Sequence, residues 1–363
     1  MRADWTYKTW ADVLTIINGK NQSAVESANG EFPIYGSGGI MGYASEWLCP
    51  ENSVIIGRKG NINKPLFVTT KFWNVDTAFG LCAKKELLLP KYLFYFCIDY
   101  NFERHNKAVT IPSLTKADLL KISILVPPIN VQQSIVSELD KINELIGLKT
   151  SQLKELDNLS LSLFHDMFGD PIENEKKWEV KKLGEIFETS SGGTPSKSHN
   201  EYYEGGTIPW LRSGEVSQGF ISETEMYITE AGLNNSSAKF FPPNTVVVAM
   251  YGATVGQVGV IKKKMTTNQA ICGIFPNEDY SSTFMFYFLI GMKPLYLRNA
   301  AGGAQPNISQ GIIKNTLIPI VPLPLQLEFE KRIERIEQQK QQISSAIKDL
   351  ETLFASRMQY WFG

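Results

Sequence analysis

Two segments of the chain place apolar residues at steps that alternate between four and three. Stepping in this way from Ile135 to Met167 meets eight apolar residues in ten positions, and stepping from Phe329 to Trp361 meets eight in ten again. Heptad spacing sustained in this way predicts a long helix with a narrow apolar seam in each segment. A helix of roughly 35 residues, at about 1.5 Å per residue, would span about 50 Å. The residues that we expect to form the seams are Leu139, Ile142, Ile146, Leu153, Leu156, Ile333, Ile336, Ile343, Ile347 and Leu350.

A narrow apolar seam needs a partner surface to exclude water. Because the chain carries two such seams, the simplest arrangement packs the two helices on each other as a coiled coil. Such a pair would hold two globular parts at a fixed distance. The alternative is two unrelated amphipathic helices, each packed on its own domain.

The two seams belong to a repeat that covers most of the chain. Residues 52–60, NSVIIGRKG, return as residues 244–252, NTVVVAMYG, at a shift of 192, whereas the seams correspond at a shift of 194. A repeat near half the chain length is too long for a solenoid and indicates two similar large units. We therefore expect a pseudo-twofold molecule in which only loops between the strand regions and the seams have changed length.

Each copy contains the same predicted elements before its heptad segment. The β-branched runs at residues 54–56 and 246–248 follow Pro/Asn turns and indicate buried strands. Aromatic stretches at residues 90–100 and 282–290 indicate buried helices. Prolines then precede each heptad segment, where they end one element and can start a helix.

These elements predict an α+β protein with two mixed α/β domains, each followed by a long helix. We place the domains at residues 1–128 and 171–324, and the helices at residues 129–170 and 325–363. With 363 residues, 43% of them hydrophobic and 20% charged, the chain has the composition of an ordinary globular protein.

Composition also bears on the cellular compartment. No apolar stretch approaches the ~20 residues that span a bilayer, so we expect no membrane association. The first residues lack the apolar core of a secretion signal. Four cysteines without C-x-x-C spacing indicate free thiols in a reducing cytoplasm.

The net charge of −1 conceals an uneven distribution. Residues 1–128 hold 14 basic against 11 acidic side chains, a net charge of +3, and residues 176–324 hold 13 against 11, a net charge of +2. Residues 129–175 hold 3 against 9, a net charge of −6. The two domains can therefore each present a basic face, while the negative excess lies in one predicted helix.

The motifs of common catalytic sites are missing. There is no G-x-x-x-x-G-K-[ST] loop, and the glycines of residues 36–42 miss the G-x-G-x-x-G spacing. We expect residues 35–42 to form a flexible loop that could bring the backbone close to a ligand. The three histidines, His105, His165 and His199, are isolated from one another and from the cysteines, so no metal site is indicated. The acidic run at residues 170–176 could serve a nuclease, but its position between the first helix and the second domain favours a polar linker.

Residues suited to binding recur in both domains instead. Arg can contact guanine through two hydrogen bonds, Asn can contact adenine in the same way, and Lys can contact phosphate. An ordinary surface loop is the alternative for each motif alone, but the recurrence in both copies favours DNA binding. The candidate DNA-binding residues are Tyr35, Ser37, Arg58, Lys59, Asn61, Lys64, Lys197, Arg212, Ser213, Tyr251, Lys262 and Lys263.

Several of these motifs resemble the type I restriction-modification specificity subunits. In the first copy, FPIYGSGG at residues 32–39, IGRKG at 56–60 and WNVDT at 73–77 resemble one variety of target-recognition domain. The second copy resembles another variety, through GGTPS at residues 192–196, IPWLRS at 208–213, AMYGATVG at 249–256 and TNQ at 267–269. VPP at residues 126–128 and LFHDMFG at 163–169 are similar to the family's spacer regions, although residues 324–329, PLQLEF, depart from the expected helix start.

The resemblance implies a non-catalytic subunit that reads a split, asymmetric DNA sequence, one half-site per recognition domain. It implies an antiparallel pair of spacer helices that sets the gap. We expect each domain to lie against the major groove, with polar loops reaching base edges and Lys or Arg holding phosphates. The implied partners are double-stranded DNA, two methyltransferase subunits and restriction/translocase subunits. No cofactor is expected on this chain, because S-adenosylmethionine, ATP and Mg would be held by the partner subunits. The alternative function is a non-catalytic scaffold with two protein-binding heads on a coiled-coil spacer.

Overall fold

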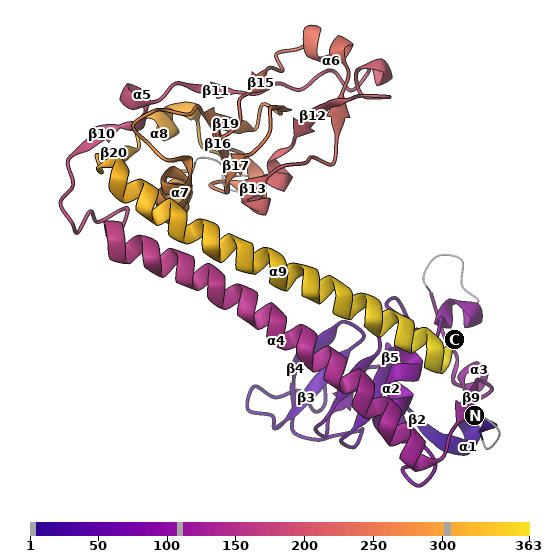
Figure 1. The fold of residues 1–363 in the computed structure, drawn as a ribbon. Helices are drawn as coiled ribbons and strands as arrows, with labels where there is room; N and C mark the ends of the chain where they lie inside the picture. The colour runs from indigo at the N-terminus through magenta and orange to yellow at the C-terminus, as the bar shows by residue number, and fades with distance from the viewer. Residues whose placement is uncertain (1–4, 107–111, 301–305) are drawn as a thin grey trace. The chain divides into compact units, whose positions relative to one another are not determined.

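The computed structural model describes residues 5–106, 112–300 and 306–363. They form two compact units whose elements are labelled in Figure 1. Unit 1 contains the described residues up to Ser151 together with Ser344–Gly363, and unit 2 contains Gln152–Ile343. The long helices α4 (Ile129–Phe168) and α9 (Leu323–Phe362) each contribute residues to both units.

Unit 1 is built around an antiparallel sheet with the strand order β2, β8, β5, β6. The bounds of these strands are Leu14–Asn18, Ala78–Ala83, Ser53–Gly57 and Leu66–Val68. Every residue of β5 is buried, which confirms the strand predicted from its β-branched run. Helix α2 (Pro90–Asp99) contacts β5, β6 and β8, and confirms the predicted aromatic helix.

Two smaller sheets and three short helices complete unit 1. Strand β3 (Phe32–Gly36) pairs antiparallel with β4 (Gly39–Ala44) and parallel with β7 (Trp73–Asn74). Strands β1 (Thr6–Thr9) and β9 (Ser123–Val126) pair antiparallel. The short helices are α1 (Trp10–Val13), the 3₁₀ helix η1 (Phe102–His105) and α3 (Lys116–Leu119).

Unit 2 repeats this architecture with one more strand in each of its two larger sheets. Its main sheet has the strand order β11, β19, β16, β17, β13, with bounds Thr189–Ser191, Ile271–Ile274, Val246–Ala249, Val258–Ile261 and Phe220–Ile221. The second sheet has the order β14, β12, β18, β15, with bounds Tyr227–Ile228, Ile208–Leu211, Met265–Thr267 and Phe240–Phe241. Strands β10 (Val180–Lys182) and β20 (Leu317–Pro319) pair antiparallel, like β1 and β9.

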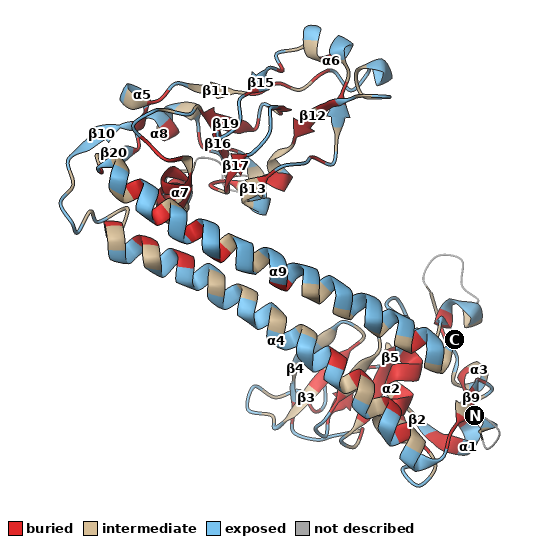
Figure 2. Cartoon of the chain, viewed as in Figure 1, coloured by how far each residue is buried: buried red, intermediate tan, exposed pale blue. Residues whose placement is uncertain are grey.

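Helix α7 (Ser282–Arg298) takes the place of α2 in unit 2 and is mostly buried, as Figure 2 shows. It extends well past the predicted residues 282–290 and contains Pro294. The other helices of the unit are short. They are α5 (Leu183–Ile186), η2 (Asn200–Tyr202), η3 (Ser213–Gln218), α6 (Glu230–Asn234), η4 (Gly252–Thr254) and α8 (Gln310–Lys314).

The turn before the central strand is the same in both units. Asn52 and Asn244 adopt positive φ values of 57° and 66°. The next residue closes each turn, since Ser53 Oγ donates to the Pro50 carbonyl at 2.8 Å and Thr245 Oγ1 donates to the Pro242 carbonyl at 2.7 Å. The sequence repeat therefore reflects a repeat of backbone conformation.

The long helices pack through the predicted seams. All ten predicted seam residues are buried or half-buried, whereas apolar Leu145, Leu148 and Leu159 of α4 are 47%, 61% and 51% exposed. Within unit 2, Lys340 Nζ lies 2.8 Å from Asp157 Oδ1, and the Phe164 and Phe329 rings lie 5.6 Å apart. Phe164 lies further along α4 than Asp157, whereas its partner Phe329 lies nearer the start of α9 than Lys340. The two helices therefore run antiparallel within this unit.

The flexible loop expected at residues 35–42 is not observed. These residues form the hairpin of β3 and β4, in which Gly36 pairs with Gly39 across a two-residue turn. Gly39 has a φ of 124°, a conformation that glycine adopts without strain. The glycines therefore serve a tight turn between paired strands.

Candidate nucleic-acid interface

In unit 1 the turn between β3 and β4 lies against the end of β5. A Cβ atom on Gly57 would lie 3.2 Å from Ser37 Cβ and 2.4 Å from the Asn61 carbonyl oxygen, so only glycine fits there. Ser37, Arg58 and Asn61 are therefore brought together at one end of the main sheet. This juxtaposition could not be read from the sequence, because Ser37 lies in the turn between β3 and β4 whereas Arg58 follows β5, which belongs to a different sheet.

Arg58 directly follows β5 at this end of the sheet, and two hydrogen bonds fix its backbone. Its amide donates to the Thr77 carbonyl at 2.8 Å, and its carbonyl accepts from the Leu114 amide at 2.9 Å. The exposed guanidinium lies 5.7 Å from the centre of the Phe79 ring, and it has no carboxylate partner among the described residues. Lys59 and Lys64 follow in the same loop and are also exposed. The loop therefore presents three cations to solvent.

Tyr35 differs from these residues, because its ring packs against the interior. It meets the Phe72 ring edge to face, with 5.6 Å between centroids. Burial, and secondarily the nearby Tyr43, raise the pKa of its phenol. Tyr35 therefore supports the β3–β4 hairpin more than it presents a polar group to a ligand.

The loop after the central strand has the same backbone in unit 2. Gly60 and Gly252 have φ values of 78° and 70°, and their amides donate to the carbonyls of Pro112 and Pro306 at 3.1 and 2.9 Å. The side chains in the two loops differ. In the order of the sequence repeat, Arg58 and Lys59 correspond to the buried Met250 and the exposed Tyr251. The two loops thus share a backbone conformation but present different side chains.

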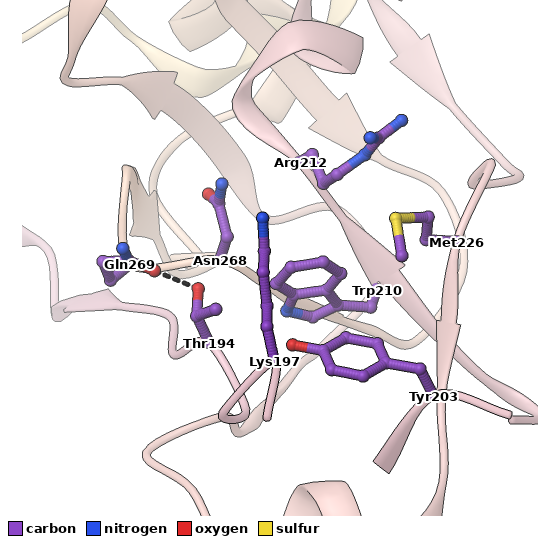
Figure 3. A pocket seen from close by; sticks show the side chains of 8 residues that line it. All are labelled: Thr194, Lys197, Tyr203, Trp210, Arg212, Met226, Asn268 and Gln269. Carbon is purple, nitrogen blue, oxygen red and sulfur yellow. Dashed lines mark hydrogen bonds between the residues drawn. The ribbon is translucent and has the colours of Figure 1, made fainter. Parts of the chain in front are cut away.

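A pocket of about 380 Å³ gathers Lys197 and Arg212 in unit 2 (Figure 3). The parallel pairing of β12 with β18 places Trp210 beside the residues that follow β18. Trp210 Nε1 donates to the Gly193 carbonyl at 2.9 Å, which fixes the indole against the loop before Lys197. The other lining residues are Thr194, Tyr203, Met226, Asn268 and Gln269.

Arg212 is already paired with two carboxylates. Its guanidinium bonds Glu225, and its Nε lies 3.4 Å from Oε2 of the buried Glu215. The neighbouring candidate Ser213 begins η3 and is half-buried. Arg212 therefore orders this side of the pocket and carries little free charge.

Lys262 and Lys263 lie away from this pocket. Lys262 Nζ donates to Asn244 Oδ1 at 3.4 Å and lies 5.5 Å from the centre of the Phe220 ring. It lines a separate hollow that also contains Glu330, Glu334 and Glu337 of α9. Lys263 is exposed in the turn between β17 and β18. The structure thus does not gather the candidate cations of unit 2 into one patch.

Sequence reasoning missed Tyr203 and Met226 as members of the pocket. Tyr203 follows η2 and Met226 precedes β14, and neither lies in a motif. Only the antiparallel pairing of β12 with β14, together with the ring contact between Tyr203 and Trp210, brings them to the site.

Metal sites and membrane spans can be assessed for residues 5–106, 112–300 and 306–363, which the structure describes. They contain no group of three His, Cys, Asp or Glu residues placed to hold a metal ion. No helix in these ranges is both long and apolar enough to cross a membrane. The four cysteines are free, as predicted, and His165 is exposed on α4.

The sequence matches the family model of the type I restriction modification DNA specificity domain over residues 2–158 and 175–352. It is 30% identical over 196 residues to the specificity subunit of a type I restriction enzyme from Escherichia coli, covering 52% of this chain and 48% of that relative. It is 32% identical over 320 residues to the HindI specificity subunit of Haemophilus influenzae, covering 67% of this chain and 68% of that relative. The chain thus spans about half the length of the first relative.

The fold is similar to that of a solved S subunit of a type I restriction-modification system from M. genitalium. The TM-score is 0.63 at 16% sequence identity, and the match covers 99% of this chain and 96% of that one. Since the family model also covers most of both units, the chain belongs to the family of type I restriction modification DNA specificity domains.

Proposed function

We propose that this chain is the DNA-recognition subunit of a type I restriction-modification enzyme and reads a split, asymmetric target with one half-site per domain. The observation that carries the proposal is the duplicated loop after β5 and β16, where one backbone frame presents Arg58 and Lys59 in one unit and Met250 and Tyr251 in the other. Because the two loops share a backbone conformation, the two domains can approach DNA in the same way. Because their side chains differ, they can contact different base sequences.

In this proposal residues 1–128 and 171–324 are the two recognition domains, and α4 with α9 sets the gap between the half-sites. The chain directs two methyltransferase subunits and the restriction/translocase subunits to the site, in the cytoplasm. S-adenosylmethionine, ATP and Mg belong to those partners, and this chain supplies recognition without catalysis.

The test is methylome sequencing of cells that express this chain with its methyltransferase subunit. We expect methylated adenines within one bipartite motif whose two halves differ. A contiguous motif, or no new methylated motif, would contradict the proposal. Binding of the assembled complex to the motif should also weaken steeply with salt, because phosphate contacts release counterions.

A further inference from the structure

We propose that the β3–β4 hairpin of unit 1 enters the major groove of DNA and that its exposed Ile40 and Met41 contact the 5-methyl group of thymine. We call residues 36–41 the hairpin tip. The inference rests on the proposed DNA-binding function and deepens it, because it assigns an apolar base contact to two residues of one recognition domain.

The hairpin tip projects from the body of unit 1. Successive side chains of a strand point to opposite faces, yet Ile40 and Met41 of β4 are both more than half exposed. Solvent therefore reaches both faces of the ribbon at this point. Met41 lies over the paired strand, since a Cβ atom on Gly36 would be 2.7 Å from Met41 Sδ. The major groove is wide enough to accept a two-stranded β-ribbon of this kind.

Exposed apolar side chains are concentrated at this hairpin and just beyond it. Ile40, Met41, Tyr43 and Trp47 are each at least 45% exposed. Single exposed apolar residues are ordinary on a protein surface, whereas a group of them indicates a surface that meets a partner. Four such side chains within residues 40–47 therefore indicate that a partner covers this part of unit 1.

The charges around the hairpin tip indicate that this partner is negative. Ser37 lies against the end of β5, because a Cβ atom on Gly57 would be 3.2 Å from Ser37 Cβ. The tip therefore lies beside the loop that begins at Arg58. Residues 58–64 of that loop hold three basic side chains and no acidic one, and residues 32–45 of the hairpin hold no charged side chain.

DNA combines the two properties that this surface requires. Phosphates line the major groove, and thymine is the base that presents a methyl group there, which apolar side chains contact. An acidic protein with an apolar surface is the competing partner. The inference commits to DNA because the DNA specificity domain model covers residues 2–158, which include the hairpin and the basic loop.

The connection that forms the hairpin tip differs between the two units. The strand order β4, β3, β7 recurs as β14, β12, β18, with the same antiparallel and parallel pairings. In unit 1 a two-residue turn joins the antiparallel pair, whereas in unit 2 residues 212–226 join it. A shared set of strands with a different connection is expected where the connection reads sequence and the strands hold the fold.

The experiment removes one methyl group at a time from the DNA target. The full chain, assembled with its methyltransferase subunits, is bound to duplexes that carry the methylated bipartite motif, and each thymine of the motif is replaced in turn by deoxyuridine. We expect one half-site to contain a thymine whose replacement weakens binding about fourfold, the effect of one methyl group removed from an apolar contact. A motif in which no thymine responds to the replacement would overturn the inference.

A double variant connects that methyl group to the hairpin tip. Ile40→Ala with Met41→Ala should bind the thymine and deoxyuridine duplexes equally, and the two single variants show which side chain makes the contact. Ile98→Ala, at a position 39% exposed on α2 of the same unit, is the matched control and should keep the fourfold difference. Thermal unfolding midpoints of all variants show whether the fold is kept. A fourfold difference that persists in the double variant would overturn the inference.

Two other outcomes would also overturn it. Equal weakening of every duplex by the double variant would mean that the tip contributes to binding without reading a methyl group. Loss of assembly with the methyltransferase subunits, with the fold kept, would identify the tip as a protein interface. Failure of the proposed function is distinguishable, because the unsubstituted complex would then produce no bipartite motif, whereas failure of this inference leaves the motif and its binding unchanged.

Discussion

Gln326 in unit 2 makes the same three hydrogen bonds that Gln132 makes in unit 1. Both side chains are fully buried one turn into a long helix. Gln132 Oε1 accepts from the Leu89 amide at 2.8 Å, and its Nε2 donates to the carbonyls of Leu87 and Pro127 at 2.9 and 2.8 Å. The corresponding partners of Gln326 are the Ser281 amide at 3.0 Å and the carbonyls of Asp279 and Val321 at 3.1 and 2.8 Å.

Each glutamine therefore joins the start of a long helix to the residue that caps α2 or α7. The unexpected sequence at residues 324–329 is explained, because Gln326 takes the position that Gln132 holds in the first copy. In the sequence repeat, residue 89 corresponds to residue 281 at a shift of 192, and residue 127 corresponds to residue 321 at a shift of 194. Each glutamine therefore bonds to residues on both sides of the point where the shift changes.

Replacing Gln132 with Met should destabilise unit 1. The change keeps the size of the side chain but leaves one buried amide and two buried carbonyls without partners, at a cost of about 3 kcal/mol in the free energy of unfolding. Hydrogen exchange of the Leu89 amide should accelerate accordingly. The matched control is Gln133→Met at the exposed neighbouring position, with a change within about 0.5 kcal/mol. Equal exchange rates in the two variants would show that the three bonds contribute nothing net.

Phe329 is the residue of α9 whose loss should most affect unit 2. Its ring lies 5.6, 5.3 and 5.3 Å from those of Phe164, Phe168 and Tyr287, and it is fully buried. Phe329→Ala should lower the free energy of unfolding by about 4 kcal/mol, because it leaves a cavity between α4, α7 and α9. Leu327→Ala, at a position 48% exposed, is the control for a change in helix propensity alone. Denaturant unfolding followed by circular dichroism measures both, and similar midpoints would contradict the prediction.

The sequence predicted what depends on local periodicity. The seams around Leu139 and Ile333 and the strand at residues 246–248 could be identified because burial repeats at the period of the element. Contacts made across sheets could not be identified. The neutralisation of Arg212 by Glu225 and the separation of Lys262 from Lys197 depend on which strands pair, and short polar loops carry no such signal.

Glu138 should give unit 1 a stability that depends on pH. It accepts hydrogen bonds from Arg357 Nη2 and Trp361 Nε1, both at 3.0 Å. The bond from Arg357, against a smaller opposing effect of burial, lowers the pKa of the Glu138 carboxyl. A folded pKa below the unfolded value of about 4.3 means that the carboxylate stabilises the fold above that pH. This contribution is lost as the pH falls through the folded pKa.

Glu138→Gln should therefore be less stable than the unsubstituted chain at pH 7, with a difference that shrinks as the pH drops below about 4. Denaturation midpoints at several pH values measure the difference. Glu144→Gln, an exposed position on the same helix, is the control. A difference that stays constant from pH 7 to pH 3 would show that shape, and not charge, is responsible.

Inserting seven residues into α4 after Ser151 and seven into α9 after Ile343 should lengthen the unspecified gap of the DNA target. One heptad preserves the seam and adds about 10 Å of helix, which corresponds to about three base pairs of 3.4 Å each. Both half-sites should remain unchanged in the methylome. An insertion in α4 alone breaks the match between the seams and should abolish methylation. A changed half-site in the double insertion would show that the helices do more than set the spacing.

Arg58→Ala should relax the sequence requirement in one half-site and leave the other intact. The free guanidinium at the end of β5 is held by backbone bonds on both sides, so it can make a directed contact to a base edge. Loss of such a contact costs about 1–3 kcal/mol in discrimination at one base pair. Methylome sequencing shows which base becomes tolerated, and Lys263→Ala, an exposed cation of unit 2, is the matched control. If the Arg58 variant instead weakens binding to all sequences and lowers the salt slope by about one, Arg58 contacts phosphate and the base-reading role passes to Ser37 or Asn61.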